Sequence, residues 1–187
     1  ILLWQVWDVA RTGGDALGAD PVAEIEHRLG LWALRFLMLA LAITPLRQLS
    51  GKPVLVRFRR MLGLYAFFYA SLHLAAYLGL DLRGYWTQIF EEIAKRPYIT
   101  VGFAAWLLLL PLALTSTNRA VRALGGRAWQ TLHRLVYLVA GLALLHFFWM
   151  RSGKNDYAEV ALYAAIIGVL LLERLFRYLK PRGVASR

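Results

Sequence analysis

The feature that most constrains this chain is a series of apolar segments long enough to cross a membrane. A hydrocarbon core of roughly 30 Å needs about 20 helical residues to span it. Because backbone polar groups inside lipid must be satisfied within the segment, each spanning segment is predicted to be an α-helix. Five such segments can be read in full, covering roughly residues 29–46, 61–80, 98–116, 131–149 and 157–179.

A shorter apolar stretch, "ILLWQVW", begins the chain at residues 1–7. It is too short to span, and it lacks the basic start and small-residue cleavage site of a signal peptide. We interpret it as the end of a sixth span whose beginning is missing, since the chain starts at Ile1 rather than Met. The loops are too short for a second domain. The sequence therefore predicts an all-α, polytopic membrane helical bundle of about six transmembrane helices, the first truncated, in one domain over residues 1–187.

The charges between the spans alternate in sign, as the positive-inside rule requires of short loops. Segments 47–60 and 118–127 carry five and three basic residues and no acid, and segment 173–187 carries five basic residues and one acid. The other segments hold the remaining ten of the eleven acidic residues. The net charge of +11 is therefore an orientation signal, not a nucleic-acid-binding surface. We expect a multi-pass protein surrounded by membrane lipid, with a cytoplasmic C-terminus and with outer loops 8–28, 81–97 and 150–156.

Three of the four histidines, His73, His133 and His146, lie inside apolar segments. Ionisable residues at membrane depth by default indicate a functional site. The alternative is that each histidine only donates a hydrogen bond to a neighbouring helix. Because the chain has no cysteine, thiolate-held clusters are excluded and a redox centre would rely on nitrogen or oxygen ligands or on no coordinate bond.

Depth favours a pair formed by His73 and His146. His73 lies about 10 Å, and His146 about 5 Å, from the outer end of its span, at 1.5 Å per helical residue. Two histidines from different helices at a common level are what a six-coordinate haem needs. Small residues nearby would let a flat macrocycle approach the backbone: Ala66, Ala70, Ala140, Gly141 and Ala143.

His133 lies about 20 Å below His146 along the same predicted helix, where a second haem could sit. Arg59 stands at that level of the third span, and a guanidinium has no lone pair for iron. Arg59 suits a haem propionate, a flavin phosphate or a lipid headgroup. Arg35 lies two turns inside the second span, where a haem propionate is one partner and snorkelling to the surface is the alternative. His27 is expected to be an exposed interfacial histidine or a contact for a quinol or partner protein.

The chain resembles the MsrQ (YedZ) family of haem-binding membrane subunits, within the ferric-reductase-like transmembrane superfamily. The resemblance rests on four stretches in order, which cover most of residues 29–149. They are "WALRFLMLALAITPLR", "RRMLGLYAFFYASLHLAAY", "RPYITVGFAAWLLLLPLALTS" and "LGGRAWQTLHRLVYLVAGLALLHFFW".

The resemblance implies a place in the bacterial inner membrane. It implies that electrons come from the quinone pool or from a cytoplasmic flavin reductase and pass through haem b. They would reach MsrP, a periplasmic molybdopterin enzyme that reduces methionine sulfoxide in oxidised proteins. The family is also associated with FMN. Its haem ligands fall on His73 and His146, with His133 as a further histidine, whereas Arg59 stands where two-haem relatives have histidine.

Two other functions stay open. A ferric reductase or oxidase would need a flavin and nicotinamide domain, and no G-x-G-x-x-G occurs here, so only one driven by a separate reductase fits. A cofactor-free membrane scaffold or transporter would need a polar site at the midplane or broken helices. Pro111 could kink one span, but no carboxylate cluster accompanies it. The leading hypothesis is an electron-transfer subunit without substrate chemistry of its own.

Overall fold

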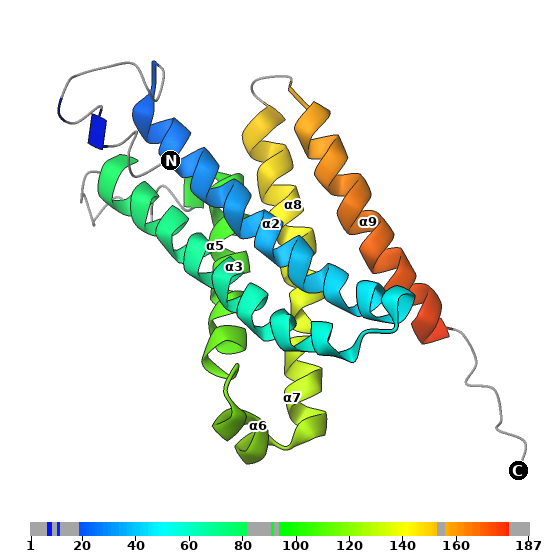
Figure 1. Ribbon diagram of the computed structural model, residues 1–187. Coiled ribbons are helices and arrows are strands. Elements are labelled where there is room, and N and C mark those ends of the chain that lie inside the picture. Colours follow the sequence, from blue (N-terminus) through cyan, green and yellow to red (C-terminus); the bar gives the residue numbers. More distant parts are fainter. Residues whose placement is uncertain are drawn as a thin grey trace, which may run out of the picture.

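The computed structural model describes residues 7–8, 11, 19–81, 91, 94–152 and 156–179. Every regular element assigned within these residues is helical, and the long helices lie beside one another in a bundle (Figure 1). The predicted all-α polytopic membrane bundle is confirmed. The long helices are α2 (Pro21–Ser50), α3 (Val56–Ala76), α5 (Pro97–Leu114), α8 (Leu135–Ser152) and α9 (Ala158–Leu179).

Four helical stretches in the described part of the chain are long and apolar enough to cross a membrane. The fifth predicted span forms α9, whose final turns carry charged residues such as Glu173 and Arg174. The expected sixth span at residues 1–7 falls, apart from its last residue, outside the described residues. The four stretches are Pro21–Ser50, Pro53–Asp81, Pro97–Leu114 and Gly126–Ser152.

α2 begins and ends where its local sequence dictates. Asp20 caps its first turn by accepting a hydrogen bond of 3.1 Å from the Ala23 backbone N–H, and Pro21 opens the helix. Gly51 ends it in the left-handed conformation, with φ of 67°. A short 3₁₀ turn, Pro53–Leu55, then returns the chain into α3. α2 and α3 consequently pack along most of their length, as do α5 and α8 (Figure 1).

The predicted span over 131–149 lies within the helical stretch Gly126–Ser152, which contains one turn residue, Arg134. A short helix, α7 (Gly126–His133), ends at Arg134, and α8 begins at Leu135. Together with α6 (Asn118–Leu124), α7 forms a helical hairpin beyond the end of α5 (Figure 1). His133 therefore lies just before this turn, near the start of the helical stretch Gly126–Ser152 that also carries His146.

Side chains from α2, α3, α8 and α9 meet in one buried core that includes Leu37, Ala66 and Val139. Two arginines hold α9 against this core. Arg35 of α2 donates from Nε to the Tyr163 hydroxyl at 2.8 Å. Arg174 of α9 donates to the Tyr137 hydroxyl at 2.6 Å and to the Leu41 carbonyl at 3.0 Å. These charge-assisted bonds satisfy groups that lipid would leave unpaired.

The packing of α9 can be tested at Ile167, which is 1% exposed, against Leu172, which is 65% exposed on the same helix. We expect Ile167→Ala to destabilise the detergent-solubilised protein by roughly 2 kcal/mol or more, because it leaves a cavity among packed helices. Leu172→Ala should have little effect, since its side chain faces lipid or detergent. Thermal unfolding of both variants is the measurement, and equal melting temperatures would contradict the packing described here.

Candidate functional site

The structure brings two of the three membrane-depth histidines together. His73 of α3 and His146 of α8 face each other with ring centroids 6.0 Å apart and ring planes inclined at 72°. Both residues are half-buried, and their rings are within direct contact distance although α5, α6 and α7 lie between them in the sequence. The pair therefore joins two helix pairs, α2 with α3 and α5 with α8.

Each histidine is held from behind by a backbone carbonyl on the neighbouring helix. His73 Nδ1 lies 2.9 Å from the Glu26 carbonyl oxygen of α2. His146 Nδ1 lies 2.7 Å from the Tyr98 carbonyl oxygen of α5. A carbonyl oxygen can only accept, so each Nδ1 carries the proton and donates it. In the neutral ring this leaves the lone pair on Nε2, which is the state a metal ligand needs.

The separation of the two rings fits a single metal between them. A metal–imidazole bond is about 2.0 Å long and roughly 1 Å separates a ring nitrogen from the ring centre, so opposed ligands have centroids about 6 Å apart. Across the residues described, no group of three or more His, Cys, Asp or Glu side chains could hold a metal ion. Two opposed imidazoles match iron whose other four ligands come from a porphyrin.

The small residues expected around the pair have different surroundings. Ala66 and Ala140 are buried in the core, with exposed fractions of 1% and 0%. Ala70 and Ala143 pack against that core from the side. Gly141 is exposed on α8, and its expected place beside a macrocycle stays a prediction.

His133 has a different hydrogen-bond state from the other two histidines. Its Nε2 lies 3.0 Å from the Thr115 hydroxyl, which itself donates to the Pro111 carbonyl at 2.6 Å. Because a hydroxyl has one proton, Thr115 accepts from His133, and Nε2 carries the hydrogen. Trp129 stacks on the imidazole at 3.9 Å and donates to the Thr115 carbonyl. This arrangement pins α7 to the end of α5.

The two arginines singled out in the sequence occupy separate places. Arg59 lies near the basic end of the bundle. There its positive charge is close enough to act electrostatically on His133 and to repel Arg174. Arg35 is directed toward α9, with its guanidinium carbon 5.2 Å from the centre of the Trp32 ring. Its Nε bond to Tyr163 shows that a protein hydroxyl already supplies one partner.

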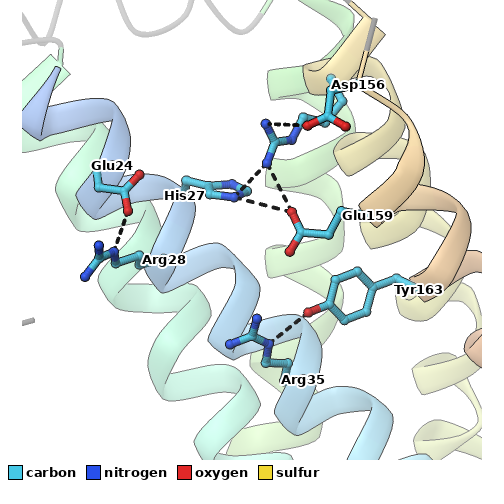
Figure 2. A network of polar contacts seen from close by, with 8 residues as sticks. Glu24, His27, Arg28, Arg35, Asp156, Glu159 and Tyr163 are labelled. Carbon is cyan, nitrogen blue, oxygen red and sulfur yellow. Dashed lines mark hydrogen bonds and ion pairs between the residues drawn. The ribbon is translucent and has the colours of Figure 1, made fainter. Parts of the chain in front are cut away.

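A polar network occupies the opposite, acidic end of the bundle (Figure 2). Arg151 of α8 donates to His27 Nε2 at 2.8 Å and to Glu159 at 3.1 Å, and it lies 3.6 Å from Asp156. Because arginine only donates, His27 accepts through Nε2 and is neutral in this arrangement. His27 is thus part of a network joining α2, α8 and α9, with Arg28 and Glu24 paired on the next turn.

Sequence reasoning did not identify the groups that hold the histidines. The carbonyls of Glu26 and Tyr98 are backbone atoms that any residue supplies, so no residue type marks them. Arg151 was also missed, because it was read as one of the charges in an outer turn. Tyr98 could have been placed beside His146 by comparing how far each residue lies from the outer end of its predicted span.

Comparison with known proteins adds an independent observation. Residues 29–144 match the family described as "Ferric reductase like transmembrane component". Over 187 residues the sequence is 66% identical to the "Protein-methionine-sulfoxide reductase heme-binding subunit MsrQ" of Xanthomonas euvesicatoria pv. vesicatoria (strain 85-10), covering 100% of this chain and 84% of that protein.

A more distant relative gives the same result. The protein of the same name from Polaromonas naphthalenivorans (strain CJ2) is 51% identical over 177 residues, covering 95% of this chain and 81% of its own length. The matched regions include the helices that carry His73 and His146 in this chain. On these matches the chain belongs to the MsrQ family, within the ferric-reductase-like transmembrane components.

Proposed function

We propose that this protein is a haem b-bearing electron-transfer subunit of a methionine sulfoxide reductase system. The observation that carries the proposal is the opposed pair of His73 and His146, each with Nδ1 committed to a carbonyl and Nε2 available. The names of the relatives support the cofactor and the system. The electron acceptor we propose is MsrP, the periplasmic molybdopterin subunit that reduces methionine sulfoxide in oxidised proteins.

The chain's own residues bind and orient the cofactor. When bound, a haem supplies one-electron chemistry between ferric and ferrous iron. The hydrogen bonds at Nδ1 fix both ring orientations and make each Nε2 a stronger donor of electron density. If His73 and His146 both hold the haem, the protein supplies two ligands to it, which favours electron transfer over oxygen activation.

The distribution of charge supports an orientation in the bacterial inner membrane. The basic residues of the α2–α3 connection and of α6 and α7 lie at one end of the bundle, which we assign to the cytoplasm together with the C-terminal end of α9 (Figure 1). The acidic groups around Arg151 lie at the other end (Figure 2). The histidine pair is nearer this end, because Glu26 lies close to the start of α2.

The electron donor in this proposal is either quinol or a cytoplasmic flavin reductase. Arg59 and the basic segment 47–60 lie at the cytoplasmic end, where a flavin such as FMN or an acidic reductase would approach. FMN stays a prediction from the family resemblance. That Arg35 binds a haem propionate also stays a prediction.

The ligand assignment predicts the optical spectrum of the purified protein. Dithionite reduction should produce a low-spin b-type spectrum, and His73→Ala or His146→Ala should abolish it because each removes one of the two histidines that would hold the haem. His27→Ala is the matched control, since its Nε2 is bonded to Arg151. A folded but colourless wild-type protein, or unchanged spectra in both ligand variants, would refute the assignment.

The state of His133 predicts one haem per chain. Its Nε2 is protonated toward Thr115, and Arg59 at the same end offers no lone pair. We expect a haem-to-protein ratio near one that His133→Ala leaves unchanged. Pyridine haemochrome quantification of both proteins checks this. A ratio near two that falls in His133→Ala would instead assign a second haem to His133.

The donor can be identified with the protein in liposomes under anaerobic conditions. We expect the α-band of reduced haem to appear on addition of a short-chain quinol, or of NADH with a flavin reductase. Reoxidation should follow when oxidised MsrP is added outside. Reduction without transfer to MsrP would contradict the proposed acceptor.

A further inference from the structure

The contact behind His73 has two parts, both supplied by α2. The Glu26 carbonyl accepts from Nδ1 at 2.9 Å. Gly30, four residues later, lies against the same ring, and a Cβ placed there would be 3.4 Å from both Nδ1 and Cε1. The imidazole therefore rests on bare backbone at this position.

The same arrangement recurs on α5 behind His146. The Tyr98 carbonyl accepts at 2.7 Å, and Gly102 follows four residues later. A Cβ on Gly102 would lie 2.7 Å from Nδ1 and 2.9 Å from Cε1, closer than non-bonded atoms approach. A carbonyl at position i and glycine at i+4 thus hold both histidines.

Helix geometry explains the spacing. Residues four apart lie above one another on one face, and the Cα–Cβ bond leans toward the helix N-terminus. A side chain at i+4 therefore covers the carbonyl of residue i on the outside of the helix. Glycine leaves that carbonyl open, so that an imidazole from another helix can reach it.

Other glycines in the described helices do not share this role. Gly63 lies on α3 with His73, and Gly141 lies on α8 with His146, yet a Cβ on either would meet nothing within 4 Å. Gly168 of α9 is equally open. A Cβ on Gly102 would overlap His146, whereas one on Gly30 would lie at the edge of ordinary van der Waals contact with His73. Glycine weakens a helix interior relative to alanine, so its presence at position 102 above all needs a reason.

We propose that Gly30 and Gly102 are positioning residues that set the tautomer and orientation of the two iron-binding histidines. The inference rests on the proposed haem function. Each glycine opens one carbonyl, the carbonyl fixes the proton on Nδ1, and Nε2 thereby keeps the lone pair that a metal ligand needs. Because a Cβ would come closer to the ring at Gly102 than at Gly30, we expect a side chain at position 102 to displace its histidine further.

The test is the spectrum and midpoint potential of Gly102→Ala in the full-length, haem-loaded protein. The added methyl group displaces the ring from the Tyr98 carbonyl, so His146 loses its Nδ1 hydrogen bond. Weaker electron donation by the ligand favours ferrous iron. We expect an upward shift of the midpoint potential and partial conversion from low-spin to high-spin haem, or reduced haem per chain.

Gly168→Ala is the matched control, because it adds the same methyl group to α9, a helix that carries neither proposed ligand, and meets no neighbour within 4 Å. Its spectrum and potential should equal those of the wild type. Gly30→Ala gives a graded comparison and guards against poor folding of Gly102→Ala. It should retain low-spin haem with a smaller shift of potential in the same direction, and Gly63→Ala should show none.

The outcomes separate this inference from the proposed function. If wild-type haem is lost in His73→Ala and His146→Ala while both Gly102→Ala and Gly30→Ala keep the wild-type spectrum and potential, the positioning role is wrong and the haem function stands. If the wild-type protein binds no haem, the proposed function fails and this inference fails with it. Shifts in the two glycine variants alone, ordered as above, support the positioning role.

Discussion

A hydrogen bond from an imidazole N–H to a helix carbonyl is the interaction on which the centre of this structure depends. In lipid no water can satisfy either histidine, so each N–H must find a protein acceptor. The Glu26 and Tyr98 carbonyls provide it while still belonging to regular helices. Because each bond links two helices, the chemical state of the site and the packing of the bundle are set by the same contacts.

The two ends of the bundle use polar groups differently. At the acidic end, Arg151 joins His27, Glu159 of α9 and Asp156, which lies just before α9, in one network. At the basic end, His133 and Trp129 attach α7 to α5, and Arg174 attaches α9 to α2 and α8. The histidine pair lies in the less polar part of the bundle between them. Long polar side chains thus fix the ends, while small residues and backbone fix the interior.

Much of the fold follows from the sequence, because hydrophobic length and loop charge are direct consequences of the membrane. Counting residues along two spans also placed His73 and His146 at a similar depth, which is where the structure has them. The carbonyls behind the histidines were beyond prediction, since they depend on how helices pair and not on residue type. The tautomers of His73 and His133 likewise differ because their hydrogen-bond partners, Glu26 and Thr115, lie far from them in the sequence.

The pairing of helices also has a consequence for how the protein is made. α2 and α3 are consecutive, so the contact between His73 and its carbonyl needs only a simple helical hairpin. His146 requires α5, the α6–α7 hairpin and most of α8 before it can reach Tyr98. Since chains fold from the N-terminus during synthesis, one half of the site is ready while the other is still on the ribosome. In the proposed haem-binding role, a chain that has not yet completed α8 would therefore offer a single imidazole and could not hold the cofactor between two helices.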